Sequence, residues 1–164
     1  SAFVTGVQTC ALPIWPWAGA LCVTIVLVLQ SLVFADGGLT ALGANITNMA
    51  LIGTVAGYLI ALALRPLATR GRAGLLGVAF VAAFCNTVIA SLGFVLEFAL
   101  GGDPAFSPGA VIGTIVGVHC LIGIGEGIIT ALTVGAVATV RPDLMYLLRG
   151  TDRKSTRLNS SHER

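Results

Sequence analysis

The residues best suited to chemistry in this sequence lie in a polar stretch at residues 35–50 and in a histidine–glutamate pair further along. The stretch gathers acidic, amide, hydroxyl and glycine residues between two long apolar runs. A polar, glycine-rich interruption beside a bilayer is where a membrane protein exposes polar groups to water or to a solute. A tight turn joining two transmembrane helices is the simpler interpretation of the same residues.

The pair consists of His119 and Glu126, which two helical turns place on nearly the same helix face. A carboxylate inside a bilayer is costly unless it is paired or faces a cavity. Three roles stay open for Glu126: a hydrogen bond to His119 or to another helix, a polar contact with a partner subunit, and a place on an ion path. Helix packing is favoured for His119, because a metal ion bound through imidazole needs further nitrogen donors.

The polar stretch contributes three more candidates, Asp36, Asn45 and Asn48. Asn45 is interpreted either as a turn or capping residue, or as an amide that holds the outer loop or supports metal ligands. An inter-helix hydrogen bond is favoured for Asn48. The four cysteines form no C-x-x-C pair, so neither a disulfide framework nor a zinc site is expected.

The composition indicates a membrane protein. Of 164 residues, 56% are hydrophobic and only 10% are charged, whereas soluble domains carry roughly 25% charged residues. The net charge of +2 is too small to suggest a nucleic-acid partner. Apolar runs long enough to cross a bilayer predict an all-α, polytopic membrane helical bundle with about four transmembrane helices, at 17–34, 46–64, 73–100 and 110–140.

Small residues recur every four positions in these spans and predict close helix contacts; they are Gly53, Gly57 and Ala61, then Gly113 and Gly117, then Gly123 and Gly127. Asn86 and Thr87 sit near the middle of the third span, and Glu97 sits near its end. The glycine-rich run 123–127 lacks the Lys-Ser/Thr of a phosphate-binding loop. No catalytic residue is assigned, because no nucleophile or metal cluster accompanies His119 and Glu126.

The distribution of charge predicts the orientation in the membrane. Arg65, Arg70 and Arg72 lie between spans two and three, and further arginines follow span four, whereas the other two loops hold Asp36 and Asp103. The positive-inside rule therefore predicts that the arginine loop and the C-terminus are cytoplasmic.

The two ends differ in character from the rest. Residues 1–14 lack helical periodicity and residues 153–164 are abruptly polar. Both resemble translated sequencing-adapter read-through, so they are interpreted as a non-native leader and tail around a transmembrane domain at 15–152. A genuine disordered tail at each end is the alternative.

The run Phe34-Ala-Asp-Gly-Gly-Leu-Thr-Ala-Leu-Gly-Ala-Asn-Ile-Thr-Asn-Met49 resembles the signature of the CbiM/NikM family. A second block agrees, Gly117-Val-His-Cys-Leu-Ile-Gly-Ile-Gly-Glu126, and so does the ending Arg141-Pro-Asp-Leu144. The resemblance covers essentially residues 15–145. Members of this family are the substrate-capturing membrane (S) components of energy-coupling factor transporters for cobalt and nickel.

The resemblance implies where the metal binds. In this family the ion is held by the N-terminal amine, by the backbone and ring of a histidine at position two, and by a histidine in an early transmembrane segment. All of these would lie upstream of Pro16, so no metal ligand and no bound cofactor are expected within this sequence. Asp36, Asn45, Asn48, His119 and Glu126 are then supporting or helix-contact residues, and Co²⁺ or Ni²⁺ is the transported substrate of the intact protein.

The resemblance also implies partners and a location. ATPase subunits and a transmembrane coupling subunit would drive uptake, in the inner membrane of a prokaryote, with cobalt import linked to cobalamin biosynthesis. The chain itself is not expected to be an enzyme. The competing hypothesis is a structural or assembly protein of the membrane with no solute of its own, which the small-residue helix faces alone would support.

Overall fold

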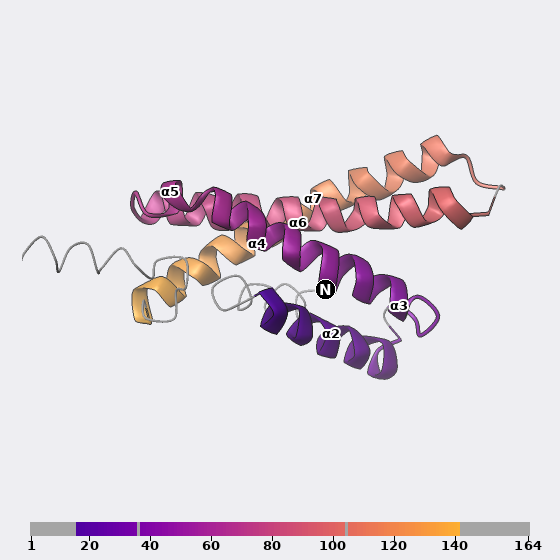
Figure 1. Cartoon of the computed structure of the whole chain (residues 1–164), viewed down its shortest axis with the longest axis horizontal. Coiled ribbons are helices and arrows are strands. Elements are labelled where there is room, and N and C mark those ends of the chain that lie inside the picture. The colour runs from indigo at the N-terminus through magenta and orange to yellow at the C-terminus, as the bar shows by residue number, and fades with distance from the viewer. Residues whose placement is uncertain (1–15, 36, 104, 142–164) are drawn as a thin grey trace, which may run out of the picture.

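The computed structural model describes residues 16–35, 37–103 and 105–141 (Figure 1). Most of these residues are helical, with no strand among them. The elements are α2 (Pro16–Val33), α3 (Leu42–Asn45), the π-helix η1 (Ile46–Gly53), α4 (Thr54–Ala63), α5 (Arg65–Ala68), α6 (Arg72–Gly101) and α7 (Pro108–Val140). The predicted leader and tail lie outside the described residues.

Four helical segments are long and apolar enough to cross a membrane: Pro16–Val33, Leu42–Ala63, Arg72–Gly101 and Pro108–Val140. The second is one rod made of α3, η1 and α4 (Figure 1). The prediction of an all-α bundle with about four spans is therefore confirmed. The π-helix and the short α5 were not predicted.

Prolines mark several helix boundaries. Pro108 occupies the first turn of α7, where its missing N–H costs no hydrogen bond. Arg141 leaves the helical region with φ −139° and ψ 69°, because the residue before a proline disfavours the α conformation. A proline also opens α5, directly after Leu64 has left the helical conformation. The arginine loop is thus a compact helical turn.

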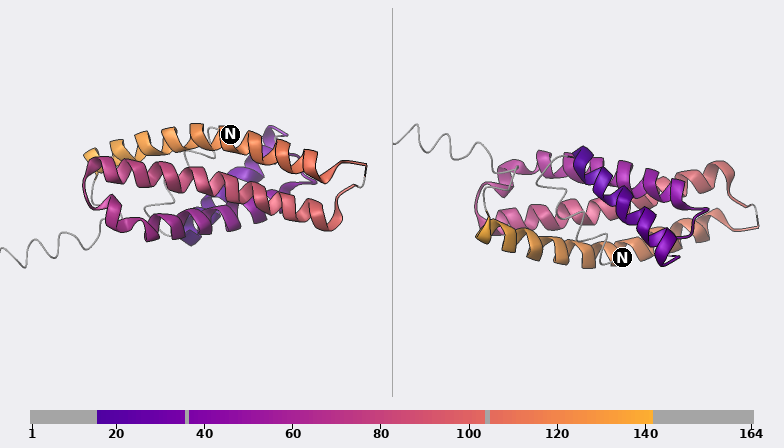
Figure 2. Two further views of the ribbon diagram at one scale, coloured as in Figure 1. Left: turned by 90° about the horizontal axis from the view of Figure 1, so that it is seen from above. Right: turned by 90° about the horizontal axis from the view of Figure 1, so that it is seen from below.

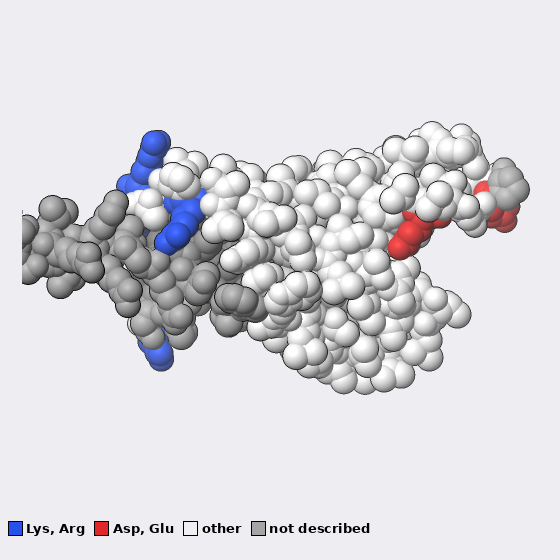
Figure 3. All heavy atoms as spheres, viewed as in Figure 1, with Lys and Arg blue, Asp and Glu red and all other residues white. Residues whose placement is uncertain are grey.

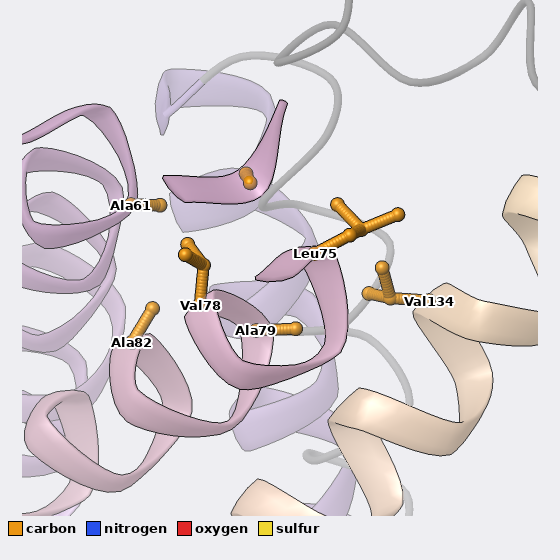
Figure 4. Packing of buried hydrophobic residues seen from close by; sticks show 7 residues of the cluster. Ala61, Leu75, Val78, Ala79, Ala82 and Val134 are labelled. Carbon is orange, nitrogen blue, oxygen red and sulfur yellow. The ribbon is translucent and has the colours of Figure 1, made fainter. Parts of the chain in front are cut away.

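The hairpin of α6 and α7 is the largest packing unit, and its two helices run side by side and antiparallel (Figure 2). The Leu42–Ala63 rod packs against α6, and α2 packs against η1 and α4. Small residues dominate one buried cluster, where Ala61, Ala79 and Ala82 meet Leu75, Val78 and Val134 (Figure 4). A second cluster joins α2 to the rod through Val23, Val26, Leu27 and Ala50.

The predicted small-residue contacts form at two of the three places. Gly53, Gly57 and Ala61 are buried on the face that meets α6. Gly123 and Gly127 are buried against the α6 side chains Phe84 and Phe80. Gly113 and Gly117 behave differently, because both are exposed and a Cβ atom on either would meet nothing within 4 Å. α7 therefore packs on α6 through one face only.

The outer surface suits lipid. Large apolar side chains on every long helix are more than half exposed, among them Leu21, Leu59, Leu96, Leu121 and Leu132. The described arginines gather at one end of the bundle, and the acidic atoms visible in Figure 3 lie at the opposite end. This separation matches the charge asymmetry on which the predicted orientation rests.

We expect Gly127→Leu to destabilise the α6–α7 hairpin and Gly113→Leu to leave it intact. A Cβ atom on Gly127 would lie 2.7 Å from the Phe80 ring and 3.1 Å from the Phe80 carbonyl oxygen, whereas Gly113 faces open space. Overpacking of this kind costs about 1–3 kcal/mol. Resistance to unfolding by a denaturing detergent measures the difference. Equal resistance of the two variants would contradict this packing.

Candidate functional site

A cavity of about 280 Å³ opens between the start of the Leu42–Ala63 rod, α6 and α7. Its lining is unusually polar for a membrane interior. Four of the five candidate residues, Asn45, Asn48, His119 and Glu126, line it together. Asp36 lies outside the described residues. The rest of the lining comes from Met49, Asn86, Thr87, Ala90, Ser91, Phe94, Ile115 and Ile122.

The π-helix η1 carries the first wall of this cavity, directly after Asn45. Its backbone is wider than an α-helix, and such segments occur frequently at functional sites. The Thr54 hydroxyl donates a hydrogen bond of 3.4 Å to the Met49 carbonyl, five residues earlier. This side chain therefore satisfies one of the carbonyl groups at the return to α-helical geometry.

Asn48 fastens η1 to α6. It is 5% exposed, and its Nδ2 donates a hydrogen bond of 3.1 Å to the Glu97 carboxylate. Its Oδ1 is buried without a hydrogen-bond partner and lies so close to Gly93 of α6 that a Cβ atom there would overlap it. The inter-helix hydrogen bond favoured for Asn48 is thus present, with Glu97 as its acceptor.

Asn86 makes the reciprocal contact from α6. It is 6% exposed, its Oδ1 is also buried without a hydrogen-bond partner, and it occupies the space beside Gly53 of η1. An asparagine of η1 therefore packs against a glycine of α6, and an asparagine of α6 packs against a glycine of η1. Contacts between a glycine Cα–H and a carbonyl oxygen are weak, so the absence of a Cβ atom is what allows this approach.

Glu126 joins α7 to α6. The Thr87 hydroxyl is within hydrogen-bonding distance of the Glu126 carboxyl group, and Thr87 itself is 8% exposed. An inter-helix hydrogen bond, one of the roles left open for Glu126, is therefore formed. Thr87 and the preceding Asn86 both line the cavity.

His119 is half-buried and bonds within its own helix. Its Nδ1 lies 2.7 Å from the Ile115 carbonyl oxygen. Because a carbonyl only accepts, Nδ1 carries a proton in this contact, which leaves Nε2 as the nitrogen that can face the cavity lining. The ring can therefore accept a proton or bind a cation through Nε2.

Asn45 contacts the loop that precedes the rod. Gly37 and Gly38 both have positive φ values, 76° and 65°, which favour glycine. A Cβ atom on Gly37 would lie 2.6 Å from Asn45 Nδ2. Asn45 thus lies between this loop and the cavity, which agrees with the outer-loop role among its open interpretations.

Sequence reasoning gave no role to four residues that build the site, namely Asn86, Thr87, Ser91 and Glu97. Thr87 and Ser91 are four residues apart and fall on one helix face, and both are buried in α6. Polar residues at helical spacing in an apolar span face a neighbouring helix or a cavity. That spacing was the available signal for Thr87 and Ser91.

Among the described residues, no group of three His, Cys, Asp or Glu side chains is arranged to hold a metal ion. The cavity instead combines one imidazole, one carboxyl group and several amides. Such a lining can stabilise a hydrated cation or exchange a proton, through oxygen and nitrogen donors that divalent metals accept.

Comparisons with known proteins give a consistent result. The family model described as the cobalt uptake substrate-specific transmembrane region, CbiM, matches residues 1–144. The chain is 34% identical over 145 residues to an Archaeoglobus fulgidus protein assigned as the fused nickel transport protein NikMN, a match that covers 88% of this chain and 47% of that protein. No solved structure matches the chain significantly.

Two further relatives extend the pattern. A Methanosphaera stadtmanae protein assigned as the cobalt transport protein CbiM is 32% identical over 137 residues, covering 82% of this chain and 60% of the relative. The fused nickel transport protein NikMN of Rhodobacter capsulatus is 30% identical over 163 residues, covering 88% and 45%. The chain therefore spans about half the length of the curated relatives it matches.

We expect Gly93→Ala to lower stability and Gly77→Ala, on the same helix, to have little effect. The new methyl group would overlap Asn48 Oδ1 at Gly93 and would meet nothing within 4 Å at Gly77. The predicted loss is about 1–3 kcal/mol, measured as a lower thermal unfolding midpoint in detergent. In an Asn48→Ala background the loss should shrink, because the overlapping atom is gone. An undiminished loss there would contradict the contact.

Proposed function

The chain belongs to the CbiM family of cobalt-uptake transmembrane proteins, and from this membership we propose that it is part of a membrane subunit that captures Co²⁺ or Ni²⁺ for ATP-driven import. The observation that carries the proposal is the polar cavity between η1, α6 and α7. A cation cannot cross hydrocarbon without polar groups to replace its water. The cavity supplies amide, imidazole and carboxyl groups within otherwise apolar spans.

The described residues support the ion and do not chelate it in this proposal. The nitrogen ligands that the family resemblance implies lie upstream of Pro16 in the intact protein. Asn48 and Asn86 hold η1 against α6, and Glu126 and Thr87 hold α7 against α6, so the cavity walls are fixed from three sides. A fixed polar wall orients ligands and lowers the cost of bringing a cation into the bilayer.

Partner subunits supply the energy. The sequence contains no phosphate-binding loop, so ATP hydrolysis belongs to separate ATPase subunits, joined through a transmembrane coupling subunit. α7 buries one face only, and the exposed Gly113 and Gly117 on it offer a surface that another helix can approach closely. No catalytic reaction is assigned to this chain.

The proposed orientation places the arginine end in the cytoplasm of a prokaryotic cell. Arg65, Arg70, Arg72 and Arg141 mark that end, and Asp103 lies in the loop at the other. The cavity then lies nearer the outer surface, because its α6 residues begin at Asn86, about midway along a helix that ends at Gly101.

A structural or assembly protein of the membrane is the second candidate, favoured by the small-residue helix faces. It predicts that Glu126→Ala changes stability or oligomeric state and leaves metal uptake unchanged. The transport proposal predicts that uptake falls in a variant that still folds.

The direct test is uptake of radioactive Co²⁺ and Ni²⁺ by cells that express the full-length parent gene with its partner subunits. We expect energy-dependent accumulation of at least one metal, reduced roughly 5- to 150-fold by Glu126→Ala, since leaving the buried Thr87 without its partner costs roughly 1–3 kcal/mol. Thr133→Val, on the same helix as Glu126 but outside the cavity lining, serves as the control and should retain most of the uptake. Uptake of some other solute with no metal dependence would refute the proposal.

The orientation is tested with single cysteines in a cysteine-free background. Ser107→Cys and Thr69→Cys place one exposed thiol at each end of the bundle. A membrane-impermeant maleimide should label Ser107→Cys on intact cells and Thr69→Cys only after permeabilisation. The reverse pattern would show the arginine end to be outside.

A further inference from the structure

The Thr87 hydroxyl has one hydrogen and two partners. One is the Ala83 carbonyl oxygen at 3.1 Å, and the other is the Glu126 carboxyl group. A carbonyl oxygen can only accept a hydrogen bond. If the single hydrogen goes to Ala83, the Thr87 oxygen is an acceptor, and the hydrogen in the second bond must come from Glu126.

Four other threonines of the bundle indicate where this hydrogen goes. Thr24, Thr47, Thr133 and Thr139 each donate to the carbonyl four residues earlier, at 2.8 to 3.0 Å. Thr87 and Ala83 have the same spacing and nearly the same distance. This back-bond is the usual state of a helical threonine. The Thr87 oxygen therefore presents lone pairs to Glu126.

The position of Glu126 within an apolar span points the same way, because an ionised carboxylate is costly there and a neutral acid that donates a hydrogen bond is far less so. We propose that Glu126 is a protonated carboxylic acid while the cavity is empty, and that it exchanges this proton for an entering divalent cation. The protonated state of Glu126 is argued from the hydrogen bonds of Thr87 and from the apolar surroundings, and it does not depend on the proposed function. The exchange rests on the proposed function, which supplies the cation.

The exchange is balanced without redox chemistry. The O–H bond of Glu126 breaks, its electron pair stays on the carboxylate oxygen, and the proton passes to cavity water. The carboxylate then neutralises one of the two charges of the cation. Among the described residues lining the cavity, His119 is the only other titratable group, and none lies on η1 or α6. Glu97, which accepts from Asn48, is exposed near the end of α6.

The test is infrared difference spectroscopy on the full chain in lipid nanodiscs near neutral pH. We expect a carboxylic-acid C=O band that disappears in Glu126→Gln and remains in Glu97→Gln. The glutamine amide can donate to Thr87 as the acid does, so Glu126→Gln should still fold. Thr87→Val removes the acceptor and should shift the band to higher frequency. Absence of a band assignable to Glu126 would overturn the protonation.

Adding Co²⁺ to the full-length parent in the same nanodiscs should then abolish the band and release about one proton per bound ion, read with a pH indicator in weak buffer. A band that Co²⁺ leaves unchanged, with no proton release, would overturn the exchange. Cellular uptake by the full-length parent is a separate measurement. Uptake combined with an unresponsive Glu126 would reject the exchange and leave the transport role standing.

Discussion

The constraint on which this structure depends is that hydrocarbon offers no hydrogen bonds. Backbone groups must then be satisfied within helices, and side-chain polar groups must find partners between helices. The described helices meet the first demand, and much of the second is met because threonine and serine hydroxyls bond to carbonyls of their own helices and Asn48 and Thr87 reach carboxyl groups. The Oδ1 atoms of Asn48 and Asn86 are the exceptions, since both are buried without a hydrogen-bond partner. The polar residues that remain are gathered around one cavity. The side chains that join the helices are therefore largely the ones that line the cavity.

Close approach of the helices is the second theme. The hydrophobic effect contributes little to association between helices inside a bilayer, so van der Waals packing at small residues contributes more. Gly53 and Gly93 leave space that Asn86 and Asn48 fill, and Gly123 and Gly127 leave space for two phenylalanines. The reciprocal asparagine–glycine contacts fix η1 on α6 without a strong hydrogen bond at either oxygen. They place Asn48 where it reaches Glu97 and the cavity at once.

Much of this fold could be predicted from the sequence, because apolar runs and prolines act locally. The four spans were located to within a few residues, and the pairs at Gly53 and Gly123 were recognised as contacts. The site was harder, because helix periodicity does not state which neighbour a polar residue meets. His119 and Glu126 were recognised, but Thr87 as the partner of Glu126 depends on how α6 and α7 pack. The π-helix was missed, because no local pattern in residues 46–53 distinguishes it from an α-helix.

The length of α6 on the two sides of the cavity is unequal. At 1.5 Å per residue, the 14 residues from Arg72 to Asn86 span roughly 21 Å, whereas the seven from Phe94 to Gly101 span about 10 Å. The packed alanines of Ala79 and Ala82 fill the longer segment. The cavity is thus displaced toward the Gly101 end of α6, and the helix that continues from it to the arginine end is about twice as long as the helix on the other side. This asymmetry leaves the closely packed alanine cluster on one side of the cavity and only the end of the α6–α7 hairpin on the other.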